Sequence, residues 1–257
     1  MSFWFTVFGI VFIFLMTTLG AAVVFFFKGA ISPKVNALFL GFASGVMIAA
    51  SIWSLLLPSI EASREKWGEW AFLPAVIGLL LGGVILVGLD KIAPCVCSGK
   101  VGKESQKSIR LFLAVTLHNI PEGLAVGFAF GAASRIGTTA AFLSALGLAI
   151  GIGIQNFPEG AAISLPMKKA VGNNATAFLW GMGSGIAEPI FAALGYFLAA
   201  NLRVLQPWLL SFSAGAMLFV AAEDLIPDAR LKEKPQIGAW GVLLGFALMM
   251  ALDVALG

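Results

Sequence analysis

The stretch LHNIPEGLAV, residues 117–126, places a histidine, an asparagine and a glutamate inside an otherwise apolar segment. His118 is the only histidine among 257 residues. The pattern returns as QNFPEGA at residues 155–161, again within an apolar run. An ionisable side chain at bilayer depth costs about 2.5–3.5 kcal/mol on insertion scales, so such residues are functional candidates. Two copies of one polar motif in two hydrophobic segments indicate a shared site rather than packing.

The composition around these motifs is that of an integral membrane protein. Hydrophobic residues make up 60% of the chain and charged residues 11%, with a mean hydropathy of +0.97. Soluble domains carry about 25% charged residues. Residues 1–27 lack a basic leading region and are too long for the apolar part of a cleavable signal, so we expect a first spanning helix there.

Apolar runs of about 20 residues, the length needed to cross a bilayer, define eight expected spans. They are residues 4–27, 34–57, 70–89, 110–133, 138–166, 175–199, 207–227 and 236–256. We therefore expect an all-α polytopic membrane protein in which residues 1–257 form a single transmembrane domain, with a loop at about residues 90–109.

Lysine and arginine gather on one side of these eight spans. With alternating loops, twelve of the 16 basic residues fall on one side and four on the other. The positive-inside rule then predicts both termini outside and the 90–109 loop in the cytoplasm. Cys95 and Cys97 lie in that loop, either to capture a soft ion or as a reduced pair without function. Because the basic residues gather on one side of the membrane, the pI of 9.0 does not indicate binding to nucleic acid.

Internal similarity extends beyond the central motifs. Residues 42–47, FASGVM, are similar to residues 212–217, FSAGAM, and each run continues to a proline, Pro58 or Pro227. The spans concerned run in opposite directions. Inverted repeats with Gly- and Pro-interrupted helices are typical of transporters with a midplane site. We expect spans 1–3 to repeat as spans 6–8, and span 4 as span 5, each in the opposite orientation. The alternative explanation of the similarity is that Gly and Pro are simply frequent in membrane helices.

The candidate donors share a place near the middle of a span: His118, Asn119 and Glu122 on the fourth, Gln155, Asn156 and Glu159 on the fifth, and Glu188 on the sixth. On a helix of 3.6 residues per turn, the three donors of each motif lie within an arc of about 100°. Imidazole and carboxylate together suit zinc, iron and manganese. Because burial and like charges oppose ionisation of carboxylates, either a divalent cation or protons must compensate them.

Residues outside the motifs have less specific interpretations. Met47 and Met217 are either core residues or, for Met47, a ligand beside the ion. Glu223 and Asp224 lie near the cytoplasmic end of the seventh span, where they line an exit or simply meet water. Glu61 and Asp253 lie at outer span ends, where we expect them to be solvated and, in a functional role, to attract cations.

The paired runs HNIPEG (118–123) and QNFPEG (155–160) resemble the fourth- and fifth-helix signatures of the ZIP (Zrt/Irt-like) divalent metal transporters. The resemblance covers the whole chain and is greatest for the GufA-like bacterial branch. It implies a centre that can hold two ions. His118, Glu122, Gln155 and Glu159 would hold one ion, with Met47 alongside, and Asn119, Glu122, Asn156, Glu159 and Glu188 the other. Glu61 and Asp253 would match entrance positions, and Glu223 and Asp224 exit positions.

This chain departs from much of the family at two places. Gln155 stands where many members have histidine, and Asn156 where some have aspartate. Both changes replace strong ligands, so we expect a softer or broader metal selectivity. An elevator-like carrier motion is also implied by the resemblance.

The function expected from these observations is transport of divalent transition metal into the cytoplasm, zinc first, with iron, manganese and cadmium as further substrates. We expect a bacterial inner-membrane protein with no enzyme activity and no organic cofactor; homodimer formation is left open. An intramembrane metalloenzyme would need more than one histidine. A proton or organic-cation carrier using the same acids is the other alternative.

Overall fold

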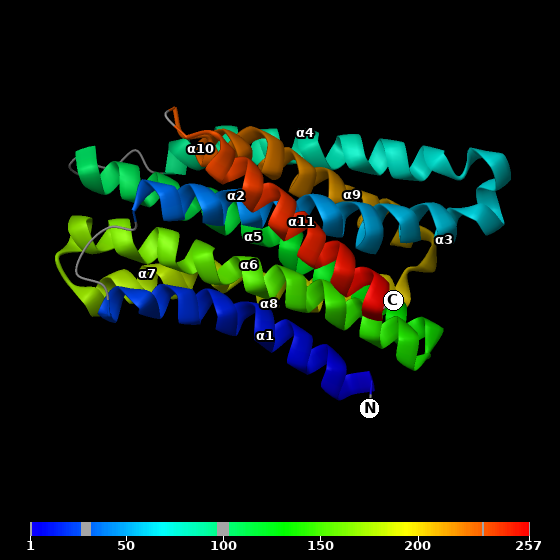
Figure 1. Ribbon diagram of the computed structural model, residues 1–257. Coiled ribbons are helices and arrows are strands. Elements are labelled where there is room, and N and C mark those ends of the chain that lie inside the picture. The colour runs from blue at the N-terminus through cyan, green and yellow to red at the C-terminus, as the bar shows by residue number, and fades with distance from the viewer. Residues whose placement is uncertain (1, 27–31, 97–102, 233, 257) are drawn as a thin grey trace.

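The computed structural model describes residues 2–26, 32–96, 103–232 and 234–256, and in these ranges all regular structure is helical (Figure 1). The first half contains α1 (Ser2–Ala22), η1 (Val23–Phe25), α2 (Pro33–Ala50), η2 (Ser51–Leu56), α3 (Leu57–Trp67), η3 (Gly68–Trp70), α4 (Phe72–Val96) and α5 (Lys103–Ile136). The second half contains α6 (Thr139–Val171), α7 (Asn174–Gly185), α8 (Ala187–Asn201), η4 (Arg203–Leu205), α9 (Gln206–Val220), η5 (Ala221–Leu225), α10 (Ile226–Ala229) and α11 (Gln236–Leu256).

Helices occupy each of the eight segments expected from the sequence. Within the described ranges, six helical stretches are long and apolar enough to cross a membrane: Phe3–Phe25, Pro33–Trp70, Thr139–Lys168, Asn174–Asn201, Gln206–Ala229 and Gln236–Leu256. The apolar stretch Phe72–Gly88 of α4 is shorter, and α5 is not among the six. The protein is therefore an all-helical, polytopic integral membrane protein.

The connection expected at residues 90–109 is helical at both of its described ends. Helix α4 continues to Val96 and α5 begins at Lys103, which leaves residues 97–102, including Cys97, outside the described residues. The segment from Lys103 to Arg110 is polar but rich in Lys, Gln, Glu and Arg, which are good helix formers. A rule that counts apolar residues does not detect such a helix end.

The sixth span was expected to be continuous over 175–199, but the helix breaks at Ile186. Pro189 has no N–H, and its ring crowds the carbonyl four residues back, that of Gly185. The Ile186 N–H accordingly bonds to the Gly183 carbonyl, three residues back, at 3.2 Å. The break separates α7 from α8 and places Glu188 in the first turn of α8.

The second and seventh spans share a widened helical segment. In each, a π-helix begins four residues after a buried methionine, Met47 or Met217, and ends immediately before a short α-helix that carries Pro58 or Pro227 in its first turn. Proline has no N–H and its ring crowds the preceding turn, and in both spans the widened segment lies immediately before it. The helix continues through Pro58 to Trp67, ten residues beyond the predicted end of the second span.

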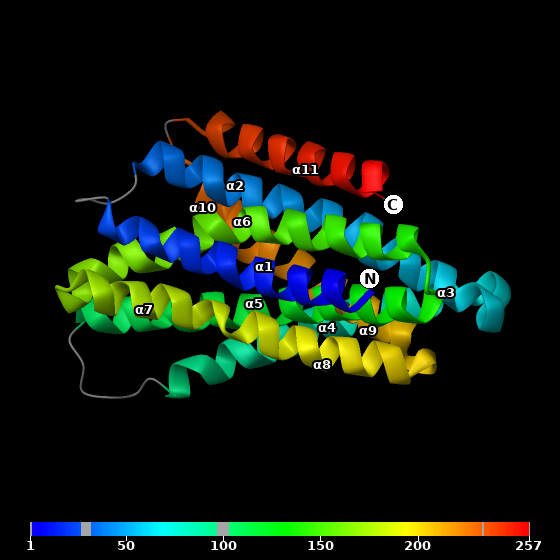
Figure 2. The same ribbon diagram turned by 90° about the horizontal axis from the view of Figure 1, so that it is seen from below.

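The packing follows the same internal symmetry. The extensive helix pairs are α2 with α11 and α4 with α9, and, on the other side of the molecule, α1 with α6 and α5 with α8 (Figures 1 and 2). If the first three spans repeat as the last three, the pair α2 with α11 is equivalent to the pair α9 with α4. In the same way, α1 with α6 is equivalent to α8 with α5. Both termini lie at the same end of the bundle (Figure 1). This arrangement is what two repeats of opposite orientation would produce.

Glycines allow the paired helices to approach closely. A methyl group at Gly160 of α6 would overlap the Thr17 carbonyl of α1, and one at Gly123 of α5 would overlap the Glu188 carbonyl of α8. Both glycines are the last residues of the two motifs. Small residues at such interfaces are how helices associate in lipid, where there is no hydrophobic drive between them. The motif glycines thus hold the central helices against α1 and α8.

Candidate metal centre

The two polar motifs lie near the middle of the two longest helices, α5 and α6. Each contains a proline inside the helix, Pro121 or Pro158, which removes one backbone hydrogen bond beside the polar residues. All six motif donors are buried: Asn119, Glu122, Gln155 and Asn156 have no exposed surface, while His118 is 7% and Glu159 8% exposed. The structure therefore places these side chains in the protein interior rather than against lipid.

Glu122 and Gln155 join the two motifs directly. The Gln155 Nε2 amide donates a hydrogen bond to Glu122 Oε1. The remaining oxygens of both side chains, Glu122 Oε2 and Gln155 Oε1, are buried and have no hydrogen-bond partner. Buried polar atoms are almost always satisfied, so such atoms need an explanation. Acceptor oxygens without hydrogen-bond partners, on two side chains that contact each other, suit a bound cation.

Glu188 reaches the same region from α8. Thr17 Oγ1 donates to Glu188 Oε1 at 2.7 Å, and Asn156 Nδ2 donates to Glu188 Oε2 at 2.8 Å. These bonds connect α1, α6 and α8. Thr17 was not predicted as a site residue; its one signal in the sequence is a hydroxyl in an apolar span, which is common in membrane helices.

His118 and Asn119 point towards different neighbours. His118 Nε2 lies 3.2 Å from Asp224 Oδ2 of η5, whose side chain is 43% exposed. Asn119 Nδ2 donates to the Ser184 carbonyl of α7 at 2.9 Å, and its Oδ1 has no partner. The imidazole therefore links the buried centre to a carboxylate that meets solvent. Glu223, next to Asp224, is exposed.

The three carboxylates of the centre act on one another. Glu122 experiences the charges of Glu159 and Glu188, and Glu159 that of His118. Within the described residues, however, no three His, Cys, Asp or Glu side chains come together as a group that could hold a metal. The donor set is instead mixed, with the amide side chains of Gln155 and Asn156 hydrogen-bonded to Glu122 and Glu188. Like charges in a low-dielectric interior repel, so a dication would draw these groups together.

Met47 is fully buried on α2, in the apolar core cluster that also contains Ala125 and Val126 of α5. Met217, its counterpart on α9, belongs to the same cluster. Their positions fit the core interpretation, and a ligand role for Met47 stays a prediction.

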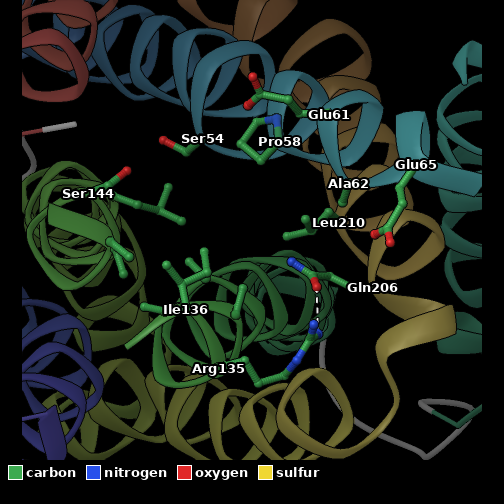
Figure 3. Close-up of a pocket in the computed structure, with 16 residues that line it drawn as sticks. Ser54, Pro58, Glu61, Ala62, Glu65, Arg135, Ile136, Ser144, Gln206 and Leu210 are labelled. Carbon is green, nitrogen blue, oxygen red and sulfur yellow. Dashed lines mark hydrogen bonds between the residues drawn. The ribbon is translucent and has the colours of Figure 1, made fainter. Parts of the chain in front are cut away.

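A cavity of about 420 Å³ opens at the end of the bundle that carries the termini (Figure 3). It lies between α3 and α9 on one side and α5 and α6 on the other, and Glu61 and Glu65 of α3 line it. Its innermost residues include Ala129 and Leu148, each seven residues from a motif donor, Glu122 or Gln155. Seven residues are about two helical turns, or roughly 10 Å. Arg135 closes the outer rim by donating to Gln206 Oε1 at 2.7 Å.

Asp253 was expected to be solvated, and that prediction is wrong. It is only 9% exposed, and Ser54 Oγ, which lines the cavity, donates to its Oδ1 at 2.5 Å. Packing of α11 against α2 and η2 covers it. Its Oδ2 has no partner. Glu61, by contrast, is exposed as expected.

Ser54→Ala should lower the stability of the protein, because it removes the hydrogen bond to a buried carboxylate that already has one free oxygen. Leaving such a group unsatisfied costs about 1–3 kcal/mol. Thermal unfolding in detergent measures the effect. Ser63→Ala is the matched control, because the Ser63 hydroxyl donates only to the Ser59 carbonyl of its own helix; equal shifts for both variants would contradict the assignment.

The geometry can now be compared with known proteins. The family model described as ZIP Zinc transporter matches residues 104–253. The chain belongs to the ZIP family. The human zinc transporter ZIP11 is 33% identical over 324 residues, which cover 94% of each chain. Zinc transporter ZIPB of Bordetella bronchiseptica is 35% identical, covering 95% of this chain and 79% of its own. Zinc transporter GufA of Myxococcus xanthus is 32% identical, covering 88% and 89%.

Membership of the ZIP family confirms the resemblance read from the two motifs. The matched region contains both motifs, Glu188 and Asp253. The protein is accordingly a ZIP-type transporter of divalent metal ions in a membrane, and not an enzyme.

Proposed function

We propose that the protein carries zinc, and with it iron, manganese or cadmium, into the cytoplasm through a centre formed between α5 and α6. The observation that carries the proposal is the set of buried motif oxygens without partners among the described residues, in the middle of two adjoining helices: Glu122 Oε2, Glu159 Oε2, Gln155 Oε1, Asn119 Oδ1 and Asn156 Oδ1. A divalent ion is the simplest group that would satisfy acceptor oxygens in a dry interior. His118, Glu122, Gln155 and Glu159 are the proposed ligands, with Met47 alongside.

The proposed path crosses a single domain of residues 1–257 with eight spans and both termini outside, in the bacterial inner membrane. Supporting this, eight helical segments lie where expected and both termini share one end of the bundle. The cavity beside Glu61 would be the entrance, followed by Ser54 and Asp253, and Asp224 and Glu223 would mark the exit. Similar proteins include the zinc transporters ZIPB of Bordetella bronchiseptica and GufA of Myxococcus xanthus.

Uptake of radioactive zinc into proteoliposomes tests the function. We expect zinc to accumulate inside only when an inward gradient and the protein are both present, without nucleotide or organic cofactor. Uptake of protons or organic cations without any metal transport would instead favour the alternative carrier.

Glu61→Gln should raise the zinc concentration for half-maximal uptake about twofold to threefold and leave the maximal rate unchanged. An exposed charge at a cavity mouth concentrates cations without binding them tightly, and salt weakens this effect. Uptake measured over a zinc series at low and at 0.3 M salt separates the two parameters. Glu69→Gln is the control, since Glu69 is exposed in η3 and does not line the cavity. The same shift in both variants would contradict an entrance at Glu61.

Gln155→His should increase the preference for zinc over manganese about tenfold. Imidazole suits zinc, whereas the amide oxygen of Gln155 suits harder ions such as manganese, so this departure favours a broader selectivity and not a softer one. Competition uptake with both metals gives the preference, and Gln236→His, at an exposed position on α11, controls for an added histidine elsewhere. An unchanged preference order would remove Gln155 from the ligand set.

A further inference from the structure

Glu188 differs from the other carboxylates of the centre in its hydrogen bonding. Both of its oxygens accept bonds from other helices, Oε1 from Thr17 at 2.7 Å and Oε2 from Asn156 at 2.8 Å. Glu122 and Glu159, by contrast, each keep a buried Oε2 with no partner. Glu188 itself has no exposed surface. Both oxygens therefore already accept a hydrogen bond within the protein, which leaves Glu188 fewer free lone pairs for a metal than Glu122 or Glu159.

The two side chains that hydrogen-bond to Glu188 are donors, and the Glu159 carboxylate acts on it through its charge. The Thr17 hydroxyl has a single hydrogen, and its distance to Glu188 Oε1 is shorter than the 3.3 Å to the Ile13 carbonyl. Asn156 Nδ2 has two hydrogens, one for Glu188 and one for the Ile13 carbonyl at 3.4 Å. Hydroxyl and amide hydrogens carry partial positive charge. They stabilise the carboxylate and oppose a cation at the same place.

The surrounding backbone leaves little space for a further ligand. Gly123 of α5 lies against the Glu188 backbone. A methyl group at Gly185 would lie 3.0 Å from Thr17 Cβ and 3.4 Å from Glu188 Oε1. Glu188 is thus held by α1, α5 and α6 at once.

We propose that Glu188 is a hydrogen-bonded anchor, positioned by Thr17 and Asn156, so that the centre holds one metal ion and not two. Glu188 acts on that ion through its charge, which also reaches Glu122 and Glu159, and does not bind it directly. The inference rests on the proposed function, because it concerns the number of ions at the same centre. It makes Thr17 a positioning residue.

Metal stoichiometry tests the proposal. Purified full-length protein is titrated with zinc by calorimetry, and bound zinc is measured by elemental analysis after removal of free metal. We expect one ion per chain for the parent protein. Glu188→Gln should keep one ion and bind it about tenfold more weakly, because a nearby charge is lost without loss of a ligand.

Asn156→Asp should create a second site. It replaces an amide donor by a carboxylate opposite Glu188, and two adjacent buried carboxylates need a cation or a proton between them. We expect two ions per chain for this variant. Because the substitution could also prevent folding, the parent and Glu188→Gln stoichiometries decide the proposal on their own.

Thr17→Val removes one bond to Glu188 with little change in shape. It should keep one ion, weaken its binding about fivefold, and lower the unfolding temperature. Thr18→Val is the matched control on the same helix, because the Thr18 hydroxyl donates to the Phe14 carbonyl of its own helix; it should behave as the parent. Equal binding by both variants would contradict the positioning role.

The outcomes separate this proposal from the proposed function. Two ions in the parent, falling to one in Glu188→Gln, would overturn the anchor and leave metal transport intact. No bound zinc in the parent, or zinc binding that is indifferent to Glu122→Gln, would overturn the proposed function itself.

Discussion

Glu122→Gln should reduce zinc uptake at least about 100-fold while the protein still folds. Glu122 is the residue at which the two motifs meet, through its bond from Gln155, and its second oxygen is free and buried. Removing one charge of a buried ionic interaction costs about 3–5 kcal/mol, and each 1.4 kcal/mol is a factor of ten in affinity. Glutamine keeps the volume of the side chain, so the loss would reflect charge rather than packing.

The measurement is initial uptake into proteoliposomes containing equal amounts of protein. Glu69→Gln provides the control, because it makes the same substitution at an exposed site in η3. Uptake by Glu122→Gln within a factor of two or three of the parent would contradict a role for Glu122 as a ligand.

Gly160→Ala should destabilise the protein by about 3 kcal/mol or more and impair transport with it. Alanine normally stabilises a helix relative to glycine, by about 1 kcal/mol. At Gly160, however, the added methyl group meets the Thr17 backbone, which cannot move aside as a flexible side chain could. Overpacking of this kind costs about 1–3 kcal/mol, occasionally more, and α1 would be displaced from α6.

Gly88→Ala in α4 is the matched control, because no atom of the part of the chain that the structure describes lies within 4 Å of the methyl group that it would add. Helix propensity alone predicts that both variants are more stable than the parent. Close packing predicts that Gly160→Ala is less stable and Gly88→Ala more stable. Unfolding temperatures in detergent, with monodispersity by size exclusion, decide between them. A Gly160→Ala protein as stable as Gly88→Ala would show that α1 and α6 do not pack as described.

The sequence predicted the motifs and their meeting because both depend on local pattern. Polar residues repeated at one spacing in two apolar runs must be buried away from lipid, so the two sets are expected to lie together. Pro58 and Pro227 follow the segments where the helices widen. The family resemblance rested on the same residues and is confirmed.

What the sequence did not predict depends on contacts between distant segments. Thr17 and Glu188 are separated by 171 positions, and nothing local distinguishes Thr17 from Thr18, whose hydroxyl bonds within its own helix. Asp253 was expected to meet water because it is near a span end, yet α11 packs so that Ser54 covers it. The polar beginning of α5 was missed because only apolar residues were counted.

The most direct test of the centre is the X-ray absorption spectrum of the zinc-loaded protein. We predict a shell of nitrogen and oxygen ligands at about 2.0–2.1 Å that includes a single imidazole. The imidazole contribution should disappear in His118→Gln, the variant without the chain's one histidine. A spectrum that His118→Gln leaves unchanged would contradict a metal centre built from the two motifs.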